Sequence, residues 1–218
     1  NYSISVSSVS LPNAPALQSF AHGTDGDYVL LFGGRTNNTP KAGGLHNMDN
    51  SSNYASSSFR PLSYNNQLFV YDITNGNADS LSKDTLQEKL IAQYCKKGTE
   101  KCKAFFKNAV SNLCNVTNPI STQAGNQLYV LGGYGFGPNL SDSTTYITYN
   151  QITTIDVPTM IKLVKGNTLT DSDWSKLIRF GSDPTNTLIS TGAEMFKIGD
   201  SIYLAGGHKF DNGTQQYL

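Results

Sequence analysis

The sequence contains few residues of the kinds that mark catalytic, metal and membrane sites. It has three cysteines, three histidines, three methionines and one tryptophan in 218 residues. It contains neither a GxSxG nucleophile motif nor an HExxH zinc motif. Its apolar runs, including the one from Tyr28 to Phe32, are too short to span a bilayer. We therefore predict no transmembrane segment, no catalytic motif, no metal site and no cofactor.

Charge is also scarce, and the two signs balance. Charged residues make up 15% of the chain, and 16 basic side chains offset 16 acidic ones, so the formal net charge is +0. This balance gives neither the basic surface that binds nucleic acid nor an acidic solvating tail. Asn, Ser and Thr supply the polarity instead, which favours a location outside the cytoplasm. We predict an extracellular or cell-surface protein, associated with the outer membrane if bacterial, that binds no nucleic acid.

Glycine, in contrast, recurs in one specific context. A short apolar run leads into a glycine pair three times, as YVLLFGG at 28–34, LYVLGG at 128–133 and IYLAGG at 202–207. An Asp-Gly, Gly-Asn or Gly-Asp dipeptide precedes each run, and such dipeptides form the tight turns of β-hairpins. Glycine pairs suit turns with positive φ and places where backbones approach too closely for a Cβ atom. The sequence therefore predicts three β-hairpins of one kind.

Two further strand-like segments complete the repeated unit. They lie at 65–76 and 149–159, and each ends in a turn at Asp72 or Asp156. The whole pattern resembles the kelch repeat, a four-stranded blade of a β-propeller about 50 residues long. The resemblance implies an all-β, kelch-type β-propeller, similar to the surface or secreted kelch proteins of Bacteroidota. It also implies that Trp174, in DSDWSKLIRF, lies on the outer strand of a blade.

The predicted propeller is partial and forms one domain over residues 1–218. Propellers close their ring with about four to eight blades, and this sequence supplies about two and a half. We therefore expect either a piece of a longer chain or a ring that a partner chain completes; the start at Asn1 also resembles a processed product. The predicted parts are a ring-closing strand within 1–12, blade 1 at about 15–78, a helical insertion at 79–114, blade 2 at about 115–182 and a partial blade 3 at about 183–218.

The insertion at 79–114 is the one segment predicted to be helical. Two apolar stripes separated by a glycine indicate a helical hairpin, with Thr99 as the cap of its second helix. Cys95 and Cys102 lie on either side of the turn, where a disulfide would join the two helices. Free thiols and a metal site are the alternatives, and Cys114 is left over, pairs elsewhere or replaces one partner. The hairpin either caps the ring or provides a docking surface.

The loops that follow the glycine pairs are the predicted binding surface. In the family that the repeat resembles, these loops open onto one face near the central channel. Here they contain aromatic, arginine and histidine side chains, which are common at protein interfaces and suit sugar rings. The alternative is that these side chains only pack the loops against the sheets. The predicted binding residues are Arg35, His46, Arg60, Tyr134, Phe136, Tyr146, His208 and Lys209.

Several polar residues outside these loops fit structural roles. His22 precedes the first apolar run and is predicted to be a buried structural histidine. Asp72 and Asp156 are predicted to accept backbone hydrogen bonds in their turns. Asp171 and Asp173 resemble a pair of calcium ligands but lack the Gly and Glu of a calcium loop. We predict that they are turn residues.

The sequence favours a non-catalytic binding module in an envelope or extracellular assembly. Its partner would be another protein or a glycan, in a complex associated with a membrane. The alternative is a carbohydrate-active enzyme, of the isomerase or oxidase type, with its active site at the propeller channel. Convergent Arg, Glu and His side chains at the channel would indicate the enzyme. A third alternative is a structural subunit that docks through its helical hairpin.

Overall fold

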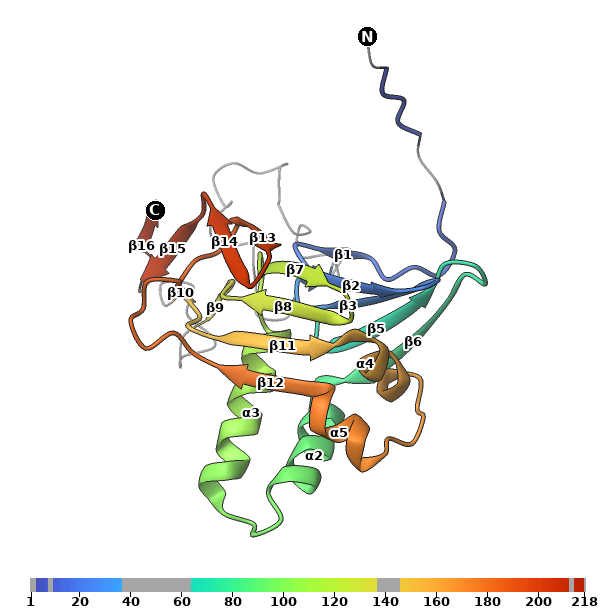
Figure 1. Cartoon of the computed structure of the whole chain (residues 1–218), viewed down its shortest axis with the longest axis vertical. Helices are drawn as coiled ribbons and strands as arrows, with labels where there is room; N and C mark the ends of the chain where they lie inside the picture. The colour runs from blue at the N-terminus through green and yellow to red at the C-terminus, as the bar shows by residue number, and fades with distance from the viewer. Residues whose placement is uncertain (1–2, 8–9, 37–63, 137–145, 212–213, 218) are drawn as a thin grey trace, which may run out of the picture.

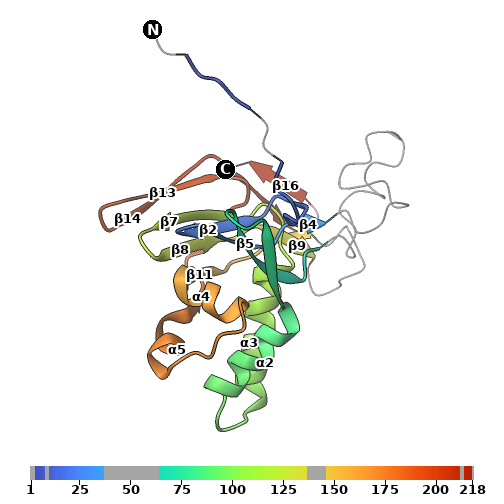
Figure 2. The same cartoon turned by 90° about the vertical axis from the view of Figure 1, so that its right-hand side faces the viewer.

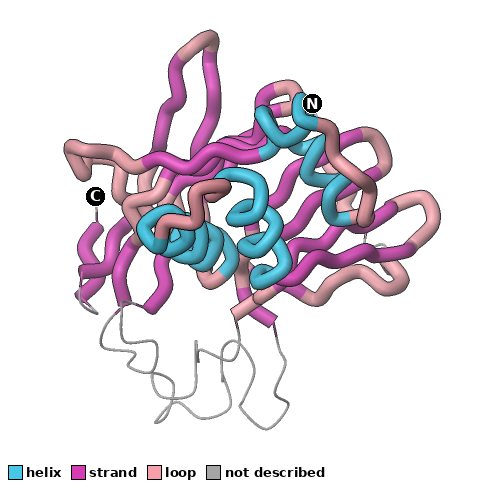
Figure 3. The backbone as a smooth tube through the Cα atoms, turned by 90° about the horizontal axis from the view of Figure 1, so that it is seen from below, coloured by secondary structure: helices cyan, strands magenta, loops and turns pink. Residues whose placement is uncertain are grey.

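The computed structural model describes residues 3–7, 10–36, 64–136, 146–211 and 214–217. Most of these residues form small antiparallel β-sheets, and the described strands do not close into a barrel. The helices gather on one side of the sheets (Figures 1 and 3). The fold is therefore mainly β, as predicted, with more helix than predicted.

The first sheet is a meander of four antiparallel strands in chain order. Its strands are β2 (Ala21–Asp25), β3 (Tyr28–Phe32), β5 (Gln67–Asp72) and β6 (Asn77–Ser82). Alternate side chains of a strand point to opposite faces. Leu30 and Phe32 of β3 and Leu68 and Val70 of β5 accordingly share the buried face. Gly26 has a positive φ in the turn between β2 and β3, as the Asp-Gly dipeptide predicts.

The second sheet repeats the same topology. Its strands are β7 (Ile120–Ala124), β8 (Gln127–Leu131), β11 (Ile152–Asp156) and β12 (Ile178–Gly181). The two Asp residues at the strand ends occupy the same register, because Asp72 pairs with Tyr28 and Asp156 pairs with Gln127. Asp72 accepts a hydrogen bond from the backbone N–H of Asn75 at 2.9 Å, as predicted. The two sheets are thus two copies of one unit.

A third hairpin and three short ribbons complete the β structure. The hairpin contains β13 (Glu194–Ile198) and β14 (Ser201–Ala205). β7 lies beside both β2 and β13, so the first strands of the three units are neighbours (Figures 1 and 2). The ribbons pair β1 (Leu17–Gln18) with β4 (Arg35–Thr36), β9 (Tyr134–Phe136) with β10 (Tyr146–Thr148), and β15 (His208–Asp211) with β16 (Thr214–Tyr217).

The three units share a backbone conformation as well as a sequence pattern. Four positions in each unit have a positive φ, and these positions recur at the same spacing along the chain. They are Ser19, Gly26, Gly33 and Gly34 in the first unit, Asn118, Gly125, Gly132 and Gly133 in the second, and Gly192, Gly199, Gly206 and Gly207 in the third. A positive φ disfavours residues with a Cβ atom, so the backbone itself requires the repeated glycines.

The predicted helical hairpin is present, but it starts later than expected. Because β6 occupies the first residues of the predicted insertion, the helices are α2 (Lys83–Tyr94) and α3 (Glu100–Cys114). The Thr99 side chain caps α3 by accepting a hydrogen bond from the backbone N–H of Cys102 at 3.4 Å. Cys95 and Cys102 form the predicted disulfide, with Cα atoms 5.8 Å apart. Cys114 is a free, buried cysteine.

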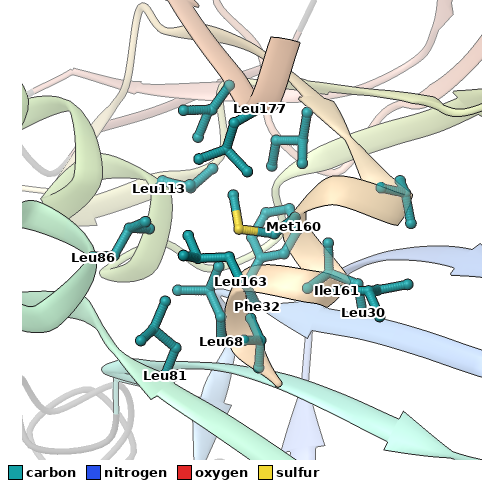
Figure 4. Packing of buried hydrophobic residues seen from close by; sticks show 14 of the residues in the cluster. Leu30, Phe32, Leu68, Leu81, Leu86, Leu113, Met160, Ile161, Leu163 and Leu177 are labelled. Carbon is teal, nitrogen blue, oxygen red and sulfur yellow. The ribbon is translucent and has the colours of Figure 1, made fainter. Parts of the chain in front are cut away.

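The prediction of a single helical segment is wrong, because α4 (Val157–Val164) and α5 (Asp171–Leu177) lie between β11 and β12. The helix α4 exposes Lys162 to solvent, buries most of its other side chains and packs against strands of both sheets. Met160, Ile161 and Leu163 fill the core beside Leu30 and Phe32 (Figure 4). Each buried aliphatic side chain of this size contributes about 1.5–3 kcal/mol. The core therefore consists of side chains from sheets and helices together.

Three predictions about this region need correction. Asp156 ends β11 and accepts a backbone hydrogen bond, as predicted, but the donor is the N–H of Thr159 at 3.2 Å, so Asp156 caps the helix α4 and does not form a turn. Asp171 and Asp173 lie in the first turn of α5, where Asp173 and Thr170 form a capping box. Trp174 lies on α5 and not on a strand, with its ring 6.5 Å from that of Tyr94 on α2.

Candidate functional site

The residue that follows each glycine pair occupies the same place in its unit. These residues are Arg35, Tyr134 and His208, the first residues of β4, β9 and β15. Each pairs in antiparallel fashion with the segment that leads into its own hairpin, through Gln18, Thr117 and Thr191 respectively. Three of the residues predicted from the sequence thus lie at equivalent positions of the repeat.

The glycine pairs also join one unit to the next. The N–H of Gly34 donates to the carbonyl of Val116 at 2.7 Å, and the N–H of Gly133 donates to that of Ser190 at 3.1 Å. A Cβ atom on Gly133 would lie 2.9 Å from the Cα of Pro119, too close for real atoms. The second glycine of the pair is therefore required both by its φ and by the segment that leads into its own hairpin. A Cβ atom on the first glycine, Gly132, would instead overlap the carbonyl of Ser190 in the following unit.

Arg35 is buried and contacts Tyr64, the first described residue after the segment 37–63. Its side chain is 1% exposed. Nη2 donates to the hydroxyl of Tyr64 at 3.2 Å, and the guanidinium carbon lies 4.3 Å from the centre of the Tyr64 ring. Such contacts combine a hydrogen bond with the attraction between a cation and an aromatic face. Arg35 and Tyr64 therefore hold together the two ends of the first long loop.

A cluster of aromatic side chains holds together the two ends of the second loop, residues 137–145. Strands β9 and β10 flank this segment and pair with each other, and the rings of Tyr134 and Tyr146 pack edge to face with centres 5.8 Å apart. Phe210 of β15 joins them from the third unit, 4.6 Å from Tyr134 and 6.1 Å from Tyr146. Its backbone N–H donates to the hydroxyl of Thr148 at 2.8 Å. Side chains from the second and third units thus meet at the base of this loop.

Burial controls the ionisation of the groups around Arg35. Burial raises the pKa of Tyr64 and of Tyr146, and it raises the pKa of Tyr149 to about 12; the Arg35 guanidinium opposes each rise. Burial also lowers the pKa of His208, because it disfavours the charged imidazolium. At neutral pH the tyrosines around Arg35 are therefore neutral phenols and His208 is a neutral imidazole, which suits hydrogen bonding and packing. We name Arg35, Tyr64, Tyr134, Tyr146 and Tyr149 the arginine–tyrosine anchor.

The predicted binding residues fall into three groups. Arg35 and Tyr134 are buried members of the anchor, and Tyr146 is a half-buried member. His208 and Lys209 are half-buried and lie outside the anchor. His46 and Arg60 lie outside the described residues, as does the side chain of Phe136. For Arg35 and Tyr134 the burial matches the alternative interpretation, in which the side chain packs a loop down.

Sequence reasoning left Asn65 and Tyr149 out of the predicted site. The N–H of Asn65 donates to the carbonyl of Gly34 at 3.1 Å, and the N–H of Tyr149 donates to that of Gly133 at 2.9 Å. The Asn65 side chain also donates to the carbonyl of Gly33 at 3.1 Å. Asn65 lies just before β5, and Tyr149 lies just before β11, the equivalent strand of the second sheet. Aligning the two units on Asp72 and Asp156 would have identified them.

Apart from the anchor, a concave region lies between β2 and β7, the first strands of the first two units. A hollow of about 490 Å³ is lined by His22, Thr24, Ser121, Thr122, Gln123 and Gly125. The side chain of Gln123 bridges β7 and β2 by accepting from the N–H of Thr24 at 2.7 Å and donating to its carbonyl at 2.8 Å. His22 is exposed here, so the prediction of a buried histidine is wrong. Ala21 and Gly23 face the core, and strand alternation turns His22 to the opposite side.

The described residues offer neither a metal site nor a membrane-spanning helix. Within the described ranges, no group of three or more His, Cys, Asp or Glu side chains could hold a metal ion. None of the described helices combines the length and apolarity needed to cross a membrane. Comparison with protein-family models and with curated proteins finds no match for this chain.

Proposed function

We propose that this chain belongs to a kelch-type β-propeller that acts as a non-catalytic binding module. Support for the fold comes from the two four-stranded meanders, the third hairpin of the same form, and the neighbouring positions of β2, β7 and β13. A propeller blade is a four-stranded antiparallel meander, with its first strand nearest the axis. In this arrangement β2, β7 and β13 would line the central channel, and the hollow between β2 and β7 would be part of it.

The observation that carries the functional proposal is the arginine–tyrosine anchor. The chain buries a guanidinium and several phenol groups where the segments 37–63 and 137–145 leave and rejoin the described strands. Burial of polar side chains is costly unless they find partners, and here the contacts join the two ends of each connection. A rigid base of this kind lowers the entropy that a loop loses on binding. The loops after the Gly-Gly strands would thus recognise another protein or a glycan.

Two further features bear on location and on the enzyme alternative. The disulfide between Cys95 and Cys102 fits an oxidising compartment, in keeping with a role at the cell surface in an envelope or extracellular assembly. The feature that would favour a carbohydrate-active enzyme is a set of Arg, Glu and His side chains converging on the channel. Among the described residues that line the hollow, His22 is the one ionisable group.

Replacing residues 37–63 by a short Gly-Ser linker tests the proposal. The anchor and the sheets lie outside this segment, so we expect folding to persist while ligand recognition is lost. Wild type and variant would be compared on a glycan array and by cross-linking mass spectrometry in extracts of the native source. Lys197→Ala, which changes β13 away from the loops, is the matched control.

The expected result is a signal that the control retains and the loop variant loses, at an unchanged melting temperature. Equal signals from all three proteins would contradict the proposal. A signal lost only after changes at His22 or Gln123 would instead place recognition in the hollow between β2 and β7.

A further inference from the structure

The tip of the α2–α3 hairpin concentrates positive charge in a chain that is balanced overall. Six lysines and one glutamate lie between residues 89 and 107, although the whole chain has a formal net charge of +0. The rest of the chain therefore has an excess of acidic groups. The six lysines are Lys89, Lys96, Lys97, Lys101, Lys103 and Lys107.

Five of these lysines are exposed and form no ion pair or side-chain hydrogen bond with a described residue, and three of the five lie between the two bridged cysteines. The glutamate, Glu100, is engaged by Lys103, whose Nζ lies 2.8 Å from Oε1. Lys96, Lys97 and Lys101 are exposed, and none of them forms an ion pair or a side-chain hydrogen bond with a described residue. We name these three residues the lysine tip. Its charges are solvated and close together in sequence, so they can act as one group.

The disulfide fixes the backbone that carries the lysine tip. Cys95 ends α2 and Cys102 lies in the first turn of α3, so the bridge closes the short connection that contains Lys96, Lys97 and Lys101. A closed loop has fewer conformations to lose when it binds. The bridge thus keeps three positive charges together in one place.

The lysine tip lies away from the acidic groups of the sheets, although α5, which carries Asp171 and Asp173, contacts the end of α2 through Tyr94 and Trp174. The hairpin projects away from the sheets (Figures 1 and 2). Its helix α3 has 15 residues and is therefore about 22 Å long. Electrostatic interactions in physiological salt decay over about 8 Å. A negatively charged surface in contact with the tip would accordingly feel the lysines and little of the acidic groups on the sheets.

We propose that the lysine tip docks on an anionic phospholipid surface. A projecting group of lysines can touch a flat surface without a complementary pocket, and lysine acts as a compact point charge that demands no fixed geometry from a phosphate. Each lysine near such a surface strengthens binding about fivefold.

Vesicle flotation tests this proposal independently of the loop surface. The purified chain would be mixed with vesicles of phosphatidylcholine alone, or of equal parts phosphatidylcholine and phosphatidylglycerol. We expect it to float with the anionic vesicles only and to dissociate as salt is added. Lys96→Glu combined with Lys97→Glu should weaken this binding at least about tenfold. Lys101→Glu, in the other half of the tip, should weaken it in the same direction.

Arg179→Glu combined with Lys197→Glu is the control, because it makes the same change in net charge on β12 and β13. This control should still float with anionic vesicles. Equal loss in both double variants, flotation with neutral vesicles, or no flotation of the wild type would each overturn the proposal. Salt-sensitive binding to heparin without vesicle binding would replace the lipid by an anionic glycan. Self-association abolished by the tip variant would replace it by a second copy of this chain.

Discussion

At the scale of single residues, burial decides which chemistry a side chain offers. Arg35 and Tyr134 belong to residue types that commonly bind partners, yet both are buried and serve to hold loop ends. His22 belongs to a type that often lies in a core, yet it is exposed in a hollow. These assignments depend on which neighbours the other units bring. Burial therefore decides whether a side chain can reach a ligand or, like Arg35 and Tyr134, holds parts of the chain together.

Cys114 gives a prediction at this scale. Burial raises the pKa of its thiol to about 12, well above the value of about 8.5 for a free cysteine. An acid whose pKa is raised in the folded state stabilises the protein below its unfolded pKa and loses this contribution as pH rises towards the folded pKa. We expect the free energy of unfolding to fall by up to about 1.4 kcal/mol per pH unit between about pH 9 and 12 from this group.

Urea denaturation of wild type and Cys114→Ala across this pH range provides the measurement. The variant should be less stable at pH 8, because it leaves a small cavity, and its stability should fall less steeply above pH 9. The tyrosines and lysines titrate in both proteins and so cancel in the comparison. Parallel pH profiles would contradict the prediction.

At the scale of elements, the glycine pairs and the helix caps explain which segments form. The sequence TDSD at 170–173 is a capping box, and Asp156 followed by Pro158 starts α4. Both signals were present in the sequence and could have identified the two helices that the prediction missed. The β-branched residues of β11 lead directly into α4 without a break. This continuity made a single strand with a terminal turn the simpler interpretation.

Two glycines of the second unit separate the effect of φ from that of close packing. Gly125 and Gly133 both have positive φ, but a Cβ atom would meet nothing within 4 Å at Gly125 and would overlap Val116 at Gly133. We expect Gly125→Ala to lower the free energy of unfolding by about 1–2 kcal/mol. Gly133→Ala should lower it by about 3 kcal/mol or more, because overpacking adds to the strain. Chemical denaturation would measure both, and equal losses would show that the close approach of Val116 to Gly133 is unimportant.

At the scale of the whole molecule, the three units differ in how completely their second strand is paired. β8 pairs with β7 and β11, whereas β14 pairs with β13 alone among the described strands. Several large apolar side chains of the third hairpin are also exposed. They include Phe196, Ile198, Ile202 and Tyr203. The third hairpin therefore has less support from neighbouring described residues than the hairpins of the other two units.

Hydrogen exchange measured by mass spectrometry tests this difference. β8 and β14 occupy the same place in their units and have similar sequences, so each serves as the control for the other. We expect the amides of β14 to exchange at least about tenfold faster than those of β8, because local opening costs less where pairing and burial are lower. Equal protection would indicate that a second molecule covers β14 in solution, and its dependence on protein concentration would identify this case.

The sequence by itself determined the features that depend on residues close together in the chain. The turn dipeptides, the glycine pairs, the cap at Thr99 and the pairing of Cys95 with Cys102 each arise from local backbone geometry, which nearby residues dictate. Only the tertiary structure decided that Arg35 meets Tyr64, that Phe210 joins Tyr134, and that α4 fills the core. Burial is a property of the assembled units: strand periodicity tells which residues share a face, and packing between units decides which face is covered.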